Sequence, residues 1–369
     1  MVYRDFKGLS LSRLGMGNMR LPVIAGGKDK DIDYEKAQAI IDYAMSNGIN
    51  YFDSAYVYHS GESERFAGKA LKKYPRDSYY ITTKYAFFAN PDYKAVFKEQ
   101  LERYQTDCID FYLIHCLLDN NIEDYLTNGC IDFFLQMKKE GKIKYLGFSS
   151  HASLETLERF ADHHQWDFAQ IQLNYYDWNY SNAKKEYEIL TERNIPVMVM
   201  ESVRGGRLSS LTPEAEKLLK DCHPDWSVSS WAFRWLKRLP NVVVSLSGMS
   251  NLAQIEDNVA TYADDRALTD EEEKLLFKAC ELFQTQLKVP CTACRYCCDG
   301  CPVEINIPEV LKVYNRFKID GSNALGGLKK VETKGQPADC VGCGACTGHC
   351  PQSIDVPAAM KELAEALSK

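Results

Sequence analysis

Hydrophobic and polar positions alternate in a regular order from residue 14 to residue 262. Short apolar runs rich in β-branched and aromatic side chains predict strands at 14–16, 50–53, 79–84, 109–115, 143–149, 168–173, 196–200 and 242–246. Between and after them, stretches with apolar residues at helical spacing predict helices at 34–46, 61–73, 93–104, 131–140, 154–163, 183–193, 228–238 and 252–262. Residues 2–15 alternate around Lys7 and Gly8, which predicts a short hairpin before the first strand.

This alternation of strand and helix predicts the fold class. Eight strands joined by right-handed helical crossovers are most simply closed into a parallel (β/α)8 TIM barrel of the α/β class. A further helix begins after Thr269 and Asp270, and Pro290 marks a change in composition. We therefore expect the barrel to occupy residues 1–285 and a small second domain, organised by cysteines, to occupy residues 286–369.

Three of the predicted strands end in an ionisable side chain, namely Asp53, Lys84 and His115, and Tyr58 follows in the loop after Asp53. The carboxyl ends of barrel strands meet on one face, where the catalytic residues of such barrels lie. These four groups therefore predict a proton-transfer site. The alternative is a structural ion pair of Asp53 with Lys84 beside a buried histidine.

The motifs D-S-A-x-x-Y, T-K and L-I-H around these four residues resemble, in order and spacing, the catalytic tetrad of the aldo-keto reductases. The resemblance covers residues 1 to about 265. It implies an NAD(P)H-dependent oxidoreductase that interconverts an aldehyde or ketone and an alcohol by hydride transfer. Tyr58 would then be the general acid, Lys84 would stabilise its phenolate, Asp53 would orient Lys84, and His115 would bond the carbonyl oxygen.

The same resemblance implies a set of residues that bind the nicotinamide nucleotide. They are Ser149, Ser150, Gln170 and Met200 at the nicotinamide, Gly205, Gly206, Gly248 and Met249 at the phosphates, and Gln254 and Asn258 at the adenosine. The glycines could instead be ordinary tight turns. Met200 stands where the family usually places an aromatic ring. The basic residues that grip the 2′-phosphate in NADP-specific members are missing near Gly248 and at Gln254, so NADP(H) and NAD(H) both remain candidates, with Arg204 or Arg207 as substitutes for the missing charge.

Cysteine changes the interpretation of the rest of the chain. Nine of the 14 cysteines lie between Cys291 and Cys350, and such clustering in a chain without secretory features indicates metal binding rather than disulfides. The spacing C-x2-C-x2-C-x3-C-P occurs twice, with cysteines at 291, 294, 297 and 301 and at 340, 343, 346 and 350. This is the spacing of bacterial ferredoxins. Structural zinc is the competing interpretation, because paired cysteines also suit a tetrahedral ion.

In two-cluster ferredoxins the fourth cysteine of each run binds the other cluster. This resemblance implies one [4Fe-4S] cluster on Cys291, Cys294, Cys297 and Cys350, and a second on Cys301, Cys340, Cys343 and Cys346. Cys298 falls outside the spacing and is expected to be a free thiol, with its exchange for Cys297 as a ligand as the alternative. Predicted helices at 308–317 and 356–367, with a loop at 321–335, favour a small α-helical ferredoxin-like dicluster domain. The whole chain resembles aldo-keto reductases with a C-terminal iron–sulfur domain, which are typical of anaerobes.

Nicotinamide moves two electrons as hydride whereas iron–sulfur clusters move one, and no flavin motif is evident to connect them. Two alternatives to a carbonyl reductase therefore stay open: an electron-transfer adaptor whose partner is a ferredoxin or flavoprotein, and a regulatory barrel that binds nucleotide without turnover. The complete tetrad favours the enzyme. A net charge of −7 without a basic block argues against a nucleic-acid partner. We expect no membrane span, no signal peptide and a cytoplasmic location.

Overall fold

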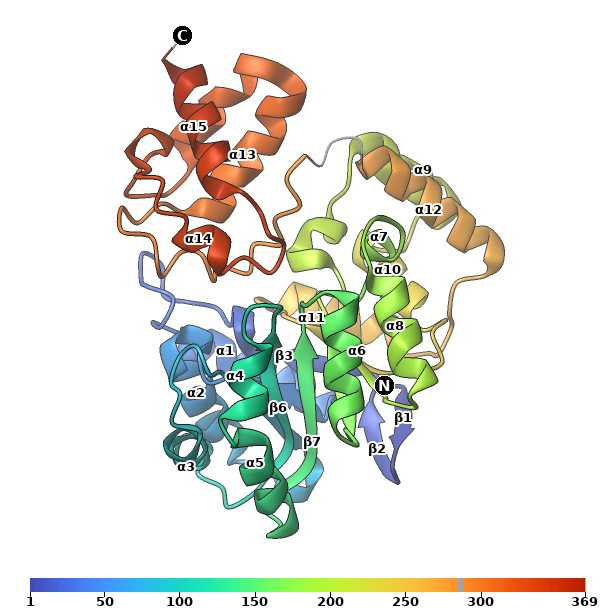
Figure 1. Ribbon diagram of the computed structural model, residues 1–369. Coiled ribbons are helices and arrows are strands. Elements are labelled where there is room, and N and C mark those ends of the chain that lie inside the picture. Colours follow the sequence, from blue (N-terminus) through green and yellow to red (C-terminus); the bar gives the residue numbers. More distant parts are fainter. Residues whose placement is uncertain (285–287, 369) are drawn as a thin grey trace. The chain divides into compact units, whose positions relative to one another are not determined.

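The computed structural model describes residues 1–284 and 288–368, which form two compact units (Figure 1). The first unit comprises Met1–Val203 and Ser229–Glu273, and the second comprises Arg204–Val228 together with the described residues from Lys274 onward. The segment Arg204–Val228, which the sequence places between two barrel elements, thus packs with the C-terminal part of the chain. The predicted boundary between residues 285 and 286 lies outside the described residues and stays a prediction.

The first unit is a closed barrel of parallel strands, which confirms the predicted fold class. Each strand pairs with the next along the chain, and the last pairs with the first, in the order β10-β3-β4-β5-β6-β7-β8-β9. The strands are β3 (Leu14–Gly17), β4 (Tyr51–Asp53), β5 (Tyr80–Tyr85), β6 (Ile109–Leu117), β7 (Ile143–Ser150), β8 (Phe168–Gln172), β9 (Val197–Met200) and β10 (Val242–Ser247).

Amphipathic helices follow the strands and lie outside them (Figure 1). They are α1 (Tyr34–Ser46), α2 (Glu62–Leu71), α3 (Tyr93–Tyr104), α5 (Cys130–Lys139), α6 (Leu154–His163), α8 (Ala183–Glu192), α10 (Val228–Leu236) and α11 (Leu252–Thr261). Shorter elements interrupt the loops: α4 (Ile122–Thr127), α7 (Tyr175–Tyr180), and the 3-10 turns η1 (Asn18–Arg20), η2 (Tyr58–Gly61) and η3 (Arg76–Ser78). The helix α12 (Asp270–Gln284) comes after the barrel. None of the described helices is long and apolar enough to cross a membrane.

The amino-terminal hairpin closes one end of the barrel. Strands β1 (Tyr3–Phe6) and β2 (Leu9–Ser12) pair antiparallel, and Phe6 and Leu11 are buried in one apolar cluster with interior residues of the barrel strands. The ring centroid of Phe6 lies 5.4 Å from that of Phe111. With this end filled by side chains, the opposite end, where the strands terminate, is left to carry the site.

The second unit packs around helices α13 (Ile307–Asp320) and α15 (Val356–Leu367). Their apolar faces share one core, and at its edge the Tyr314 hydroxyl donates to Glu362 at 2.5 Å. The predicted helices of this region are confirmed, whereas the predicted loop at 321–335 is partly the 3-10 segment η5 (Gly321–Lys330). The remaining elements are η4 (Arg204–Ser209), α9 (Pro213–Cys222), η6 (Pro337–Asp339) and α14 (Ala345–Gly348).

Candidate functional site

The structure brings the four predicted catalytic side chains together at the carboxyl end of the barrel. Asp53 ends β4, Lys84 lies near the end of β5, His115 lies on β6, and Tyr58 begins the turn η2. The Lys84 Nζ atom donates to Asp53 Oδ1 at 2.7 Å and to the Ser54 carbonyl at 2.5 Å. It also lies 4.9 Å from the centroid of the Tyr58 ring. A cation is thus held beside the phenol by a carboxylate and a carbonyl.

His115 faces the same phenol from the next strand. Its ring lies edge-on to that of Tyr58, with centroids 6.0 Å apart. The pairing of β6 with β7 shifts register between Ile114 and Leu117, and Cys116 has a φ of 58°, so the strand bulges where it carries the imidazole. Bulges of this kind re-aim a side chain beside many active sites. The buried Nδ1 atom of His115 has no hydrogen-bond partner among the described residues.

Burial dominates the electrostatics of these groups. It lowers the pKa of Lys84 from its ordinary value, and the Asp53 carboxylate opposes that shift. Burial likewise raises the pKa of Asp53, opposed by the Lys84 ammonium. The pKa of His115 lies well below its usual range because the ring is buried, and because Lys84 and His151 add positive charge nearby. His115 is therefore a neutral hydrogen-bond group at neutral pH.

A neutral buried imidazole predicts a pH dependence of stability. The folded state of His115 binds a proton less readily than the unfolded state, whose pKa is about 6.5, so stability falls as the pH drops below that value. We expect the free energy of unfolding of His115→Gln to lose about 1.4 kcal/mol less between pH 7.5 and 5.5 than that of the natural protein. Anaerobic denaturant titrations between pH 7.5 and 5.5 measure both slopes, and equal slopes would contradict a neutral His115.

The residues predicted for the nicotinamide lie on β7, β8 and β9, beside the tetrad strands. Ser149 and Gln170 face each other in the register of β7 and β8. The Ser149 hydroxyl accepts from the Cys116 amide at 2.9 Å, which leaves its O–H to donate. The Oε1 atom of Gln170 is buried without a partner among the described residues, while its Nε2 contacts the Met200 sulfur at 3.7 Å. One hydrogen-bond donor and one acceptor are therefore available side by side.

The turn after β10 holds the predicted residues for the other end of the nucleotide. The Gln254 carboxamide accepts from the Ser250 amide at 2.7 Å, and Asn258 donates to Ser247 at 3.0 Å. Met249, which lies between Ser247 and Ser250 in the sequence, is buried. The helix α11 begins at Leu252, and the Asn251 side chain caps its N-terminus. Gln254 and Asn258 thus shape the turn at Gly248. The helix N-terminus there suits an anion.

The structure does not bring every predicted phosphate residue into this unit. Gly205 and Gly206 have φ values of 63° and 88° and belong to the second unit, so their phosphate role stays a prediction. Arg204 donates to Gln352 at 3.2 Å, and Arg207 donates to the Cys291 carbonyl. These two arginines are engaged with the cysteine region. Arg20 instead packs its side-chain stem against Gly248, where a Cβ atom would lie 3.3 Å from it.

The eight predicted cluster cysteines line two cavities of the second unit. One cavity is lined by Cys291, Cys294, Cys297 and Cys350, with apolar walls that include Leu311 and Ile354. The other is lined by Cys301, Cys340, Cys343 and Cys346. Each cavity therefore gathers three cysteines of one run and the last cysteine of the other run.

Each cavity offers the ligand set of one cluster. The ferredoxin spacing implies four cysteine thiolates for each [4Fe-4S] cluster, three from one run and one from the other. The cysteines on the two cavity walls are divided in that way. Cys298 packs against the apolar core of this unit and is not among the residues that line either cavity.

Sequence reasoning missed one polar group at the mouth of the barrel. Asn18 follows β3, whose last residue, Gly17, pairs with Asp53. Its side chain is fully buried, and neither its Oδ1 nor its Nδ2 has a partner among the described residues. A buried amide without partners is rare and points to a ligand or ordered water. A polar residue directly after a glycine at a strand end was the available signal.

Comparison with known proteins finds a family match for the barrel region and another for the cysteine-rich region. Residues 13–279 match the aldo/keto reductase family, and residues 290–354 match the 4Fe-4S dicluster domain. An uncharacterized oxidoreductase of Bacillus subtilis, YqkF, is 27% identical over 297 residues, which cover 73% of this chain and 92% of that protein.

Solved structures give the same result for the barrel. The holo form of aldo-keto reductase AKR11C1 from Bacillus halodurans superposes with a TM-score of 0.63 and 27% identity, covering 76% of this chain and 96% of that one. An aldo/keto reductase from Klebsiella pneumoniae in complex with NADP and acetate has a TM-score of 0.60 at 20% identity, covering 76% and 95% of the two chains. This last likeness concerns the fold alone.

Proposed function

The chain belongs to the aldo/keto reductase family and carries a 4Fe-4S dicluster domain, and on this basis we propose that it interconverts a carbonyl and an alcohol with NADP(H) or NAD(H). The observation that carries the proposal is the position of Lys84. Its ammonium lies 2.7 Å from Asp53 and 4.9 Å from the centre of the Tyr58 ring, so a phenol, a cation and a carboxylate act as one acid–base unit.

In the direction of reduction, the nicotinamide supplies a hydride to the carbonyl carbon. The protein must then deliver a proton to the carbonyl oxygen. A free phenol, with a pKa near 10, is a weak acid at neutral pH, but the Lys84 ammonium stabilises the phenolate that Tyr58 becomes. Neutral His115 donates a hydrogen bond to the same oxygen and so orients the carbonyl. Oxidation of an alcohol follows the same path in reverse.

The pair formed by Ser149 and Gln170 supports a nicotinamide at this site. A primary carboxamide needs a donor for its oxygen and an acceptor for its amino group. The Ser149 hydroxyl and the unpartnered Gln170 Oε1 offer that combination on paired positions of neighbouring strands. The stem of Arg20 packs beside Gly248 and brings a cation near the predicted phosphate turn, which supports the phosphorylated nucleotide.

This interpretation predicts the effect of removing the acceptor. We expect Gln170→Leu to weaken binding of NADPH or NADH about 3- to 10-fold, because the nicotinamide amino group loses one hydrogen bond. ADP-ribose, which has no nicotinamide, is the matched ligand and should bind both proteins equally. Fluorescence titration measures both dissociation constants. Equal losses for the two ligands would place Gln170 outside the nicotinamide site.

We propose that the two cysteine-lined cavities each hold one [4Fe-4S] cluster, with the ligand sets Cys291, Cys294, Cys297, Cys350 and Cys301, Cys340, Cys343, Cys346. Such clusters accept and release single electrons. The thiolates need a reducing compartment, which supports a cytoplasmic location.

The proposal is tested by turnover of the intact, anaerobically purified protein. Aldehydes, ketones and the matching alcohols are offered with NADPH, NADH or their oxidised forms, and nucleotide absorbance is followed. We expect turnover with at least one carbonyl class. Tight nucleotide binding without turnover across the set would favour a regulatory barrel instead.

An electron-transfer role is the second candidate. One cluster would be enough to stabilise a small domain, and two cavities with four cysteines each are present. Within the second unit, Arg207 also donates to the Cys291 carbonyl and so places a cation beside one ligand set. In this case a ferredoxin or flavoprotein would be the partner. Stopped-flow mixing with NADPH distinguishes the two roles: cluster bleaching at the rate of nucleotide oxidation supports electron transfer, and unchanged cluster absorbance supports the carbonyl reductase.

A further inference from the structure

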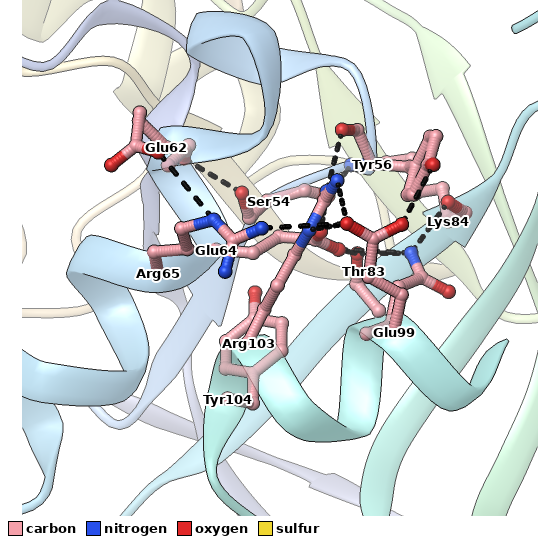
Figure 2. Close-up of polar contacts among 12 residues, drawn as sticks. Ser54, Tyr56, Glu62, Glu64, Arg65, Thr83, Lys84, Glu99, Arg103 and Tyr104 are labelled. Carbon is pink, nitrogen blue, oxygen red and sulfur yellow. Dashed lines mark hydrogen bonds and ion pairs between the residues drawn. The ribbon is translucent and has the colours of Figure 1, made fainter. Parts of the chain in front are cut away.

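A buried ion pair lies behind the strand ends that carry the tetrad. Glu64 on α2 accepts from Arg103 on α3, with Oε2 and Nη1 2.7 Å apart (Figure 2). The Glu64 side chain is fully buried, and that of Arg103 is 7% exposed. Neither residue takes part in the proton path described above. Burying a charged pair is expensive, and its replacement by apolar side chains is often neutral or stabilising, so its presence calls for a reason other than stability.

Arg103 holds the loop that carries Tyr58. Its Nη1 atom donates to the Tyr56 carbonyl at 3.0 Å, and its guanidinium lies 4.3 Å from the centroid of the Tyr56 ring. On the other side of Tyr58, a Cβ atom at Gly61 would meet the guanidinium carbon at 2.8 Å. The guanidinium thus contacts the loop backbone both before and after Tyr58.

The loop needs such support because its backbone is strained. His59 and Ser60 have φ values of 50° and 55°, in the left-handed region that non-glycine residues rarely adopt, and Gly61 follows with 91°. Strained conformations of this kind persist only where the surroundings impose them, and they gather at functional sites. The Arg103 guanidinium contacts the backbone at both ends of this segment.

Glu64 also supports Lys84, the cation beside the Tyr58 phenol, through hydrogen bonds to neighbouring residues. Its carboxylate accepts from Thr83 (Figure 2) and also from Gln100, the latter at 2.8 Å. Gln100 in turn donates to the Lys84 carbonyl at 3.0 Å. The residue before Lys84 and the backbone of Lys84 itself are therefore fixed by the same carboxylate that holds Arg103.

We propose that Glu64 and Arg103 are positioning residues for the hydride-transfer site, which together fix Tyr58 against Lys84 and balance the charge around that pair. The inference rests on the proposed carbonyl reductase function. The two residues lie on α2 and α3, outside the barrel interior. From there they would set the position and the acidity of the Tyr58 phenol.

The charges that face this centre come from several elements. Lys84 is faced by Asp53 from β4, Glu64 from α2 and His115 from β6. Glu64 is faced by Arg103 from α3 and by the phenols of Tyr104 and Tyr112. After burial and Asp53, Glu64 acts on the pKa of Lys84 and raises it. The carboxylate of Glu64 is therefore part of the field in which the phenol ionises.

The geometric part is tested with Arg103→Lys, which keeps the charge and loses the planar fork. We expect kcat for carbonyl reduction to fall at least about 10-fold, because the phenol is no longer held in reach of the carbonyl, while nucleotide affinity stays within about twofold. Arg65→Lys is the matched control, since Arg65 lies on α2, is half exposed and contacts Glu62 and Glu99 only at 3.4 Å. It should turn over like the natural protein.

The electrostatic part is tested with Glu64→Gln, which keeps the shape and removes the negative charge. Loss of a buried negative charge favours the deprotonated form of the general acid. The high-pH limb of kcat/KM for reduction should therefore move to lower pH by at least about half a unit. Glu62→Gln, a partly exposed neighbour, should leave the limb in place.

Thermal unfolding and iron content are measured for every variant, so that a folding defect is recognised. If Arg103→Lys keeps kcat, or if Glu64→Gln keeps the pH limb, the pair is structural and the inference is wrong. Both kcat per folded molecule and the position of the limb are read from the soluble fraction, so a folding defect does not alter either comparison. Absence of turnover in the natural protein would instead contradict the proposed function.

Discussion

Replacement of Tyr58 by phenylalanine should reduce the rate of carbonyl reduction at least about 100-fold while nucleotide binding stays intact. The substitution removes only the hydroxyl, and the ring keeps its contact with the Lys84 ammonium, 4.9 Å from the ring centre. The carbonyl oxygen then has no proton donor beside the cation. The loss should appear in kcat, since the hydroxyl acts on the reacting oxygen and not on the nucleotide.

A neighbouring phenol provides the control for this experiment. Tyr56 lies in the same loop, but its hydroxyl donates to Glu99 at 2.9 Å and lies outside the tetrad. Tyr56→Phe should therefore keep kcat within about threefold, because only a partly buried hydrogen bond is lost. Steady-state rates and nucleotide dissociation constants are compared for the two variants. Comparable turnover of Tyr58→Phe and Tyr56→Phe would remove Tyr58 from the role of acid.

Loss of one cluster ligand should remove a whole cluster. Two [4Fe-4S] clusters hold about eight iron atoms per chain, and Cys294→Ala should lower the content to about four. Cys298→Ala is the control, because Cys298 does not line either cavity, and its iron content should be unchanged. Iron and sulfide assays with electron paramagnetic resonance measure the result. An unchanged iron content in Cys294→Ala would contradict the ligand assignment.

Paired substitutions test how the cysteines are divided between the clusters. Cys294 and Cys350 line the same cavity, whereas Cys301 lines the other one. The variant with both Cys294 and Cys350 replaced should therefore lose no more iron than Cys294→Ala alone. Replacement of Cys294 and Cys301 together should remove both clusters. The opposite ranking would mean that each run of cysteines binds its own cluster.

The barrel could be predicted because its signals are local. Apolar runs and amphipathic stretches have different periods, and α1, α3 and α6 begin and end at the predicted residues. The helix α9 was missed although Thr212 caps it and Pro213 begins it. The helix α7 is not among the predicted helices either, because a helix of six residues is too short to show a period.

The site could be predicted only as far as sequence order reveals it. The tetrad residues lie at or just after strand ends, and the parallel strands of a barrel all end on the same face. No sequence signal identifies Glu64 and Arg103 as functional, because a charged residue in a polar helix is usually exposed to solvent. Their burial depends on how α2 packs against α3, which the period of neither helix specifies. The donor and acceptor at Ser149 and Gln170 likewise depend on register.

The central claim is that hydride, and not single electrons, passes from the nucleotide to a carbonyl at the tetrad. NADPH and NADH with deuterium at either face of the nicotinamide C4 are given to the anaerobic protein with its best carbonyl substrate, and cluster absorbance is followed during turnover. The account predicts one deuterium on the alcohol carbon, from one face only, with the clusters unchanged. An alcohol without deuterium, or clusters reduced as fast as the nucleotide is oxidised, would contradict it.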